Sequence, residues 1–130
     1  MYNPQVMDHY ENPRNVGTLN DADGVGIVGT AASGEMIKVS IQVLANKIAD
    51  VRFKAFGCPT VIAASSVMTE LIKGIQIEDA LKITNRHIET ALGGLPPDKG
   101  HYAIDAEKAA RCAIYDYISK IKIRNGGEHS

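Results

Sequence analysis

The chain has 130 residues, of which 45% are apolar and 22% charged, with a net charge of −1 and an isoelectric point of about 6.4. This balance predicts one globular domain with a real core, and it argues against nucleic acid or an anionic membrane as a partner. Two cysteines are too few for a disulfide framework, and residues 1–10 hold neither a basic cluster nor an apolar run. We therefore expect a cytoplasmic protein with reduced thiols and no membrane segment.

The N-terminal part contains one predicted helix and one predicted strand. Asn3 and Pro4 favour the N-cap and the first turn of a helix, so residues 4–10 are predicted to be helical. Turn-forming residues follow, and residues 25–29 are typical of a short edge strand interrupted by glycines.

Two alternating segments predict the centre of a β-sheet. In residues 36–44, apolar side chains alternate with Lys38, Ser40 and Gln42, and residues 47–56 alternate in the same way. The intervening pair Ala45-Asn46 is predicted to be a tight turn, because asparagine tolerates a positive φ. The expected sheet is therefore an antiparallel meander of three strands with one face in water.

Helical spacing replaces this alternation after Cys58. Apolar residues then recur every three or four positions as far as Gly74, a suitable C-terminal stop. Segment 95–100 contains two prolines and is predicted to be an exposed loop. Further helices are predicted at residues 77–84, 86–92 and 103–122.

Strands that precede helices in this way indicate an α+β fold. We expect a three-stranded antiparallel meander packed against a set of α-helices, with a long C-terminal helix. Residues 1–124 are assigned to this domain and residues 125–130 to a flexible polar tail.

Cys58 lies at the predicted change from strand to helix. Pro59 suits the first helical position, which places Cys58 at or near the N-cap. A thiolate there faces free N–H groups and the positive end of the helix dipole, and both lower the pKa of the thiol. The sequence thus predicts a functional thiol, with a small buried residue at a tight turn as the alternative.

Two other loops carry residues that are able to act with this thiol. Ser33 and Glu35 precede the second strand, and His101 and Tyr102 open the last helix. Loops held by rigid elements are where sites are usually built. A site of Cys58, His101 and the Glu35 carboxylate is therefore a hypothesis, although spacing alone does not bring these residues together.

Several motifs occur along the chain, among them Asn12-Pro13-Arg14-Asn15-Val16-Gly17, Phe56-Gly57-Cys58, Ala63-Ala64-Ser65-Ser66 and Leu92-Gly93-Gly94-Leu95-Pro96-Pro97. Each is weak alone, but in this order and spacing they are specific. With them the chain resembles the IscU/NifU N-terminal family of iron–sulfur cluster assembly scaffolds, from about residue 2 to residue 122.

The resemblance implies a scaffold fold, a non-enzymatic role and an iron–sulfur cluster, most simply [2Fe–2S], as cargo. It also implies a cysteine desulfurase as partner. Leu95-Pro96-Pro97-Asp98-Lys99 is similar to the family's recognition motif for an Hsp70-type chaperone, although Asp98 replaces an apolar residue. The family pattern has three cysteines, and this chain keeps the second as Cys58 and the adjoining histidine as His101.

The other two cysteine positions are changed. Ser33 stands at the first and Tyr102 at the third, and Glu35 replaces an aspartate. Hydroxyl oxygens are poor substitutes for thiolates in cluster binding, so Ser33 and Tyr102 are interpreted as structural residues. One chain then offers Cys58, His101 and Glu35 as ligands. A homodimer would supply two Cys58 and two His101, the donor types of a Rieske centre.

Two other functions remain open. The chain is alternatively an adaptor or persulfide carrier that docks on a cysteine desulfurase without binding a cluster. Cys58, His101 and Glu35 also match the ligand types of a mononuclear zinc site with an open fourth position. The remaining candidates are interpreted as surface residues: Cys112, His9, His87 and His129.

Overall fold

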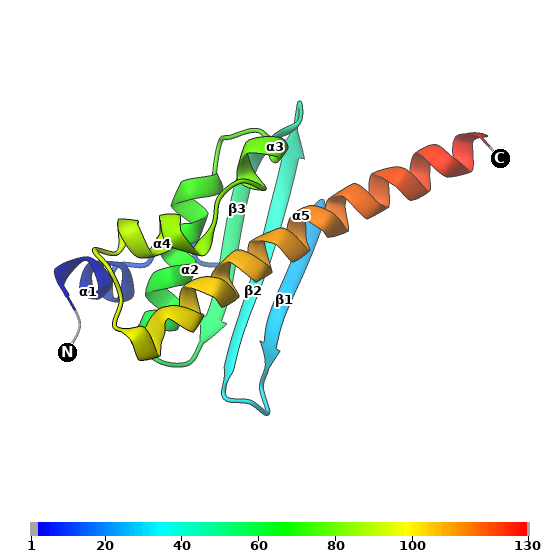
Figure 1. Ribbon diagram of the computed structural model, residues 1–130. Helices are drawn as coiled ribbons and strands as arrows, with labels where there is room; N and C mark the ends of the chain where they lie inside the picture. The colour runs from blue at the N-terminus through cyan, green and yellow to red at the C-terminus, as the bar shows by residue number, and fades with distance from the viewer. Residues whose placement is uncertain (1–2, 130) are drawn as a thin grey trace.

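The computed structural model describes residues 3–129, and the side chains of residues 3–123. A three-stranded sheet is covered on one face by helices, and the last helix runs diagonally across it and projects beyond it (Figure 1). The elements are α1 (Pro4–Glu11), β1 (Gly24–Thr30), β2 (Glu35–Leu44), β3 (Lys47–Phe56), α2 (Pro59–Ile72), α3 (Ile77–Ala80), α4 (Asn85–Ala91), a 3₁₀ turn (Pro97–Lys99) and α5 (Gly100–His129). This arrangement confirms the predicted α+β meander with a long C-terminal helix.

The sheet has the order β1-β2-β3, and both pairings are antiparallel. Ala45 and Asn46 form the predicted turn between β2 and β3, with φ values of 52° and 63°. The outer edge of β3 is also occupied. Asn15 O accepts from the Phe53 N–H at 2.9 Å, and Ile75 O accepts from the Ile48 N–H at 2.9 Å. Two loop segments thus protect β3 from pairing with another strand.

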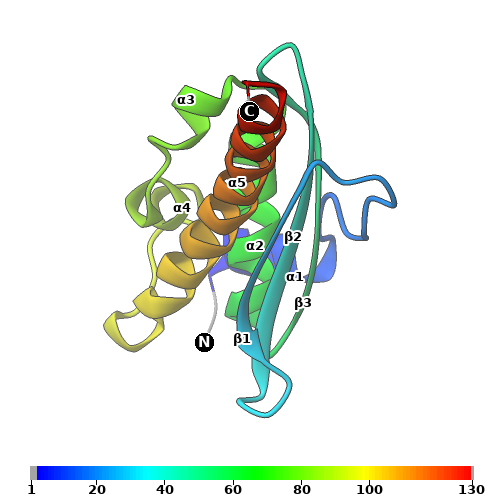
Figure 2. The same ribbon diagram turned by 90° about the vertical axis from the view of Figure 1, so that its right-hand side faces the viewer.

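The face of the sheet that was predicted to be wet is partly covered. Ser40, at the centre of β2, is only 1% exposed, and its Oγ accepts a hydrogen bond from the Leu19 N–H at 3.1 Å. The loop between α1 and β1 lies on the side of the sheet away from α5 (Figure 2). Alternation therefore identified the strand correctly, but it missed the loop that buries this serine.

Helix α5 packs closely on β1 because β1 has glycines where the two elements meet. A Cβ on Gly24 would overlap the backbone oxygen of Ala113, and one on Gly26 would overlap that of Ala109. The helix residues whose backbone meets these glycines include Ala109 and Ala113, which are buried. This small-residue contact fixes the path of α5, and with it the position of the residues at its start.

Several predicted boundaries differ from the structure. The helix expected at residues 77–84 is the single turn α3, and α4 begins at Asn85 with Thr84 as its N-cap. Helix α5 begins three residues earlier than predicted, at Gly100, and ends at His129 rather than Lys122. The description of residues 125–130 as a flexible tail stays a prediction.

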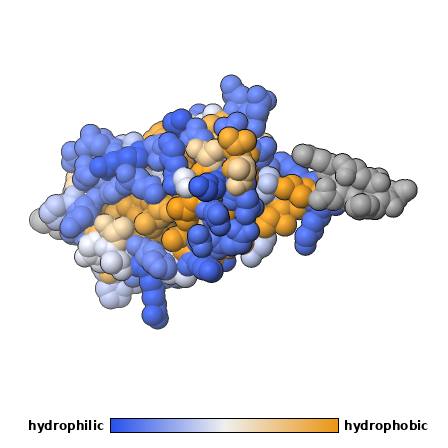
Figure 3. Space-filling model, turned by 90° about the horizontal axis from the view of Figure 1, so that it is seen from above, coloured by the Kyte–Doolittle hydropathy of each residue, from blue (hydrophilic) through white to orange (hydrophobic). Residues whose placement is uncertain are grey.

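The end of the molecule opposite the start of α5 has apolar surface (Figure 3). Leu44, beside the β2–β3 turn, is 72% exposed there. Nevertheless, no helix in the described part of the chain is both long and apolar enough to span a membrane.

Candidate functional site

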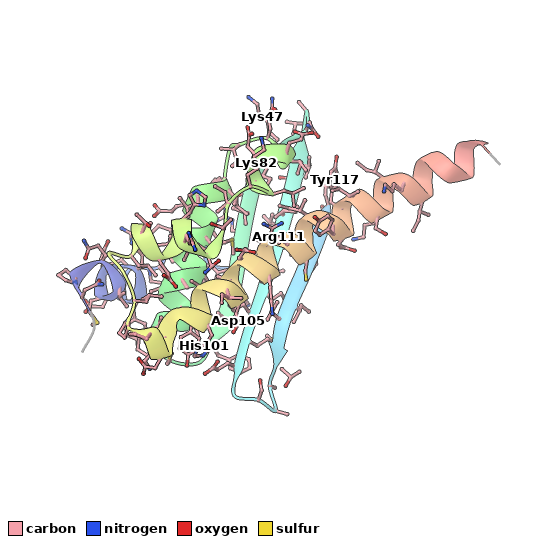
Figure 4. All side chains as sticks on the ribbon, in the orientation of Figure 1. Lys47, Lys82, His101, Asp105, Arg111 and Tyr117 are labelled. Carbon is pink, nitrogen blue, oxygen red and sulfur yellow. The ribbon has the colours of Figure 1, made fainter. Side chains whose placement is uncertain are left out.

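Three chain segments meet at the end of the sheet where α5 begins. They are the β1–β2 turn, the β3–α2 junction and the first turn of α5, which all lie at the lower end of the molecule in Figure 1. His101 and Asp105, labelled in Figure 4, lie at this end. The structure thus brings the three predicted loops to one place.

The β3–α2 junction presents Cys58 as the N-cap of α2. Gly57 has a φ of 138°, which an L side chain rarely adopts, and Pro59 follows at the start of the helix. The Cys58 side chain makes no capping hydrogen bond, and the residue is half-buried. The structure confirms the predicted N-cap position of Cys58. Its sulfur accepts no hydrogen bond from the backbone N–H groups of the first helical turn.

Glu35 and Tyr102 are joined across the site. The Tyr102 hydroxyl donates to Glu35 Oε1 at 3.0 Å, although the two residues are 67 positions apart in the sequence. The stem of Glu35 lies over Gly57, where a Cβ would be 3.1 Å from Glu35 Cγ. The absence of a side chain at Gly57 therefore gives Glu35 its place beside the cysteine loop.

Tyr102 links this pair to Cys58. Its side chain is 7% exposed, and its pKa is raised well above the ordinary value, first by hydrogen bonding with Cys58, then by burial and by the hydrogen bond with Glu35. The phenol therefore stays protonated throughout the physiological pH range. Tyr102 is thus bonded to the predicted ligand Glu35, and its interpretation as a structural residue rather than a ligand stays a prediction.

His101 is exposed beside this cluster. The centroid of its ring lies 3.9 Å from that of Tyr102, with the two planes tilted by 43°. In contrast, Ser33 is engaged in its own turn, because its Oγ lies 2.8 Å from Thr30 O and 3.0 Å from Glu35 O. The Ser33 hydroxyl is therefore occupied within its own turn, whereas His101 is exposed to solvent.

One neighbouring residue was missed in the sequence. Asp105 follows His101 by one helical turn and lines a cavity of about 180 Å³ together with Ser33, Glu35 and Val61. The i, i+4 spacing of His101 and Asp105 was the signal available for it. The cavity is small and lies next to Glu35, so it belongs to the same site.

The predicted ligands do not form a prearranged metal site in one chain. Among the described side chains, no three from His, Cys, Asp and Glu are gathered closely enough to hold a metal ion. Glu35 accepts a hydrogen bond from the Tyr102 hydroxyl, whereas His101 is exposed and has its ring beside that of Tyr102. A cluster with four protein ligands does not fit this donor set.

The four residues that were interpreted as surface residues have different outcomes. Cys112 is exposed on α5, as predicted. His9 is not a surface residue, because it is 9% exposed and its Nδ1 lies 2.8 Å from Ser66 Oγ. His87 is exposed and accepts from the Thr84 N–H at 2.9 Å. The side chain of His129 lies outside the described residues.

Comparisons with known proteins agree with this fold and show the family of the chain. Residues 1–124 match the model of the NifU-like N-terminal domain. The chain is 50% identical over 120 residues to an iron–sulfur cluster assembly scaffold protein IscU of Archaeoglobus fulgidus, covering 92% of this chain and 78% of the relative. It is 47% identical over 121 residues to IscU of Aquifex aeolicus, covering 92% and 77%. A NifU-like N-terminal protein of Brucella abortus has the same fold, with a TM-score of 0.72, 17% identity, and coverage of 91% of this chain and 94% of that one.

Proposed function

Because this chain belongs to the NifU-like N-terminal domain family, we propose that it is an iron–sulfur cluster assembly scaffold without enzymatic activity. One observation carries the proposal: Cys58, at the N-terminus of α2, has a sulfur that makes no capping hydrogen bond. The exposed His101 lies at the same end of the molecule, with its ring beside that of Tyr102. Thiolate and imidazole are the side chains that hold iron–sulfur clusters. Cys58 and His101 are the proposed contacts to the cargo.

The ligand set of one chain is incomplete, and we propose that a second copy completes it. Ser33 is engaged in its turn, and the Tyr102 hydroxyl donates to Glu35. Two copies would supply two thiolates and two imidazoles, which is the donor count of a Rieske [2Fe–2S] centre. A single [2Fe–2S] cluster shared by two chains is therefore the proposed loaded form.

The partners follow from the same role. A cysteine desulfurase would deliver sulfur to Cys58, the cysteine at the site, in a reducing compartment such as the cytoplasm. The loop before α5 is the proposed contact for an Hsp70-type chaperone. Its Pro96, Pro97 and Asp98 are exposed, and the charge of Asp98 weakens insertion into an apolar cleft.

A persulfide carrier is the second candidate. The site contains a single thiol, Cys58, because Cys112 lies farther along α5. One thiol is sufficient to accept one sulfur atom from the persulfide of a desulfurase by thiol–persulfide exchange, in which the cysteine of the desulfurase leaves as a thiolate. In this reading the chain docks on the desulfurase and carries sulfur on Cys58 without binding iron. Mass spectrometry after incubation with a desulfurase would show one added sulfur atom on Cys58, with no iron uptake.

Anaerobic reconstitution separates these functions. The protein is incubated with ferrous iron and sulfide, desalted, and examined by absorption spectroscopy and by iron and sulfide analysis. We expect sulfur-to-iron charge-transfer bands for the natural protein and for Cys112→Ala, and their loss in Cys58→Ala. A natural protein that retains no iron or sulfide would contradict the scaffold proposal.

A further inference from the structure

The hydroxyl of Tyr102 is bonded to one of the three predicted ligands. It donates to Glu35 Oε1 at 3.0 Å, and the Cys58 thiol helps to raise the pKa of this hydroxyl. A phenol has one hydrogen to donate, and here the Glu35 carboxylate receives it. A cation that binds Glu35 through Oε1 must therefore compete with this hydrogen bond.

Tyr102 is held in place by its surroundings. Its side chain is 7% exposed, the His101 ring lies against it with a centroid distance of 3.9 Å, and Lys99 Nζ lies 5.8 Å from its ring centroid. Its backbone belongs to the first turn of α5, whose path is fixed by the glycines of β1. A residue fixed in this way holds its hydrogen-bond partner in one position.

We propose that Tyr102 is a specificity-determining residue that withholds the Glu35 carboxylate from cations. One chain then presents Cys58 and His101 to its cargo, but not the three-ligand set of a mononuclear zinc site. The identity of the cargo rests on the function proposed above. The effect of Tyr102 on Glu35 is a property of the isolated chain and does not depend on that function.

Zinc binding tests this inference without any cluster. Affinity is measured by competition with a chromogenic chelator for the natural protein, Tyr102→Phe, Glu35→Gln and the double variant. A hydrogen bond to a charged group corresponds to roughly a tenfold to hundredfold change in an equilibrium constant. We therefore expect Tyr102→Phe to bind zinc at least about tenfold more tightly than the natural protein.

The other variants show whether the gain acts through Glu35. Glu35→Gln alone should change zinc affinity by no more than about twofold, because the carboxylate is already withheld. The same change made in Tyr102→Phe should remove the gain. Equal affinities for the natural protein and Tyr102→Phe, or a gain that persists in the double variant, would overturn the inference.

Two controls complete the experiment. Tyr115→Phe removes a phenol from an exposed position on the same helix and should leave zinc affinity unchanged. Tyr102→Leu also lacks the hydroxyl and serves as a second variant if Tyr102→Phe does not fold, as judged by circular dichroism. Failure to load iron and sulfide would refute the scaffold function but not this inference, which stands or falls on zinc affinity.

Discussion

Helix α2 carries the candidate site at its N-terminus and a buried polar network along its middle, and the two regions differ in how their polar groups are paired. In the network, Ser66 Oγ accepts from the Arg14 N–H at 2.9 Å and lies 2.8 Å from His9 Nδ1. Thr69 Oγ1 accepts from Asn15 Nδ2 at 3.0 Å. At the N-terminus, in contrast, Cys58 leaves its helix uncapped.

This difference separates the structural motifs from the functional ones. The motif Asn-Pro-Arg-Asn-Val-Gly binds Ser66 of the motif Ala-Ala-Ser-Ser across 52 residues of sequence, and it binds Thr69 of the same helix across 54. These hydrogen bonds hold the segment after α1 against α2. The function instead depends on Cys58, His101 and the residues that surround them.

Removing the centre of the network should have the largest effect on stability. Ser66→Ala leaves the Arg14 N–H and His9 Nδ1 without a partner, at about 1 to 3 kcal/mol for each unsatisfied buried group. We expect the free energy of unfolding, measured in urea, to fall by about 2 to 4 kcal/mol. Ser119→Ala, at an exposed position, is the control. A stability equal to that of the natural protein would show that the network is not structural.

The network should also make stability depend on pH. Burial lowers the pKa of His9 below 6.5, and Arg14 adds to this effect, while Glu70 and Asp8 partly oppose it. Below about pH 6.5 the unfolded chain binds a proton that the folded chain does not, so stability falls as the pH falls toward the lower folded pKa.

We expect His9→Gln to reduce this slope, measured as urea midpoints between about pH 7.5 and pH 5. The free energy that His9→Gln changes across this pH range should be smaller than the loss caused by Ser66→Ala. The reason is that the acidic neighbours of His9 partly compensate its positive charge. Identical slopes for the variant and the natural protein would contradict the assignment of the titration to His9.

Substitution at the site should affect stability less. Tyr102→Phe removes one hydrogen bond to the half-buried Glu35, which water is able to reach. We expect a loss of about 1.5 kcal/mol in the free energy of unfolding, the lower end of the range for a hydrogen bond to a charged group. A loss as large as that of Ser66→Ala would mean that the residues of the site also contribute strongly to folding stability.

The smallest effect is expected at Ser33. Its hydroxyl acts within the exposed β1–β2 turn, so Ser33→Ala should cost about 0.5 kcal/mol and leave iron and sulfide loading unchanged. Both quantities are measured with the natural protein in parallel. Reduced loading in this variant would identify Ser33 as a ligand and contradict its structural role.

Local features of the sequence predicted most of the fold. Alternation identified β2 and β3, and the N-cap of α1 was correct because Asn3 accepts from the Val6 N–H only three residues away. His9 was predicted wrongly because its partner Ser66 is 57 residues away. For the same reason, spacing named Glu35 and Tyr102 but did not place one against the other.

The mass and composition of the loaded protein test the central claim most directly. After anaerobic reconstitution, native mass spectrometry gives the number of chains, iron atoms and sulfide ions in each complex. The proposed shared site predicts one [2Fe–2S] cluster for every two chains and its loss in Cys58→Ala. A cluster held by a single chain, or loading that survives Cys58→Ala, would contradict the claim.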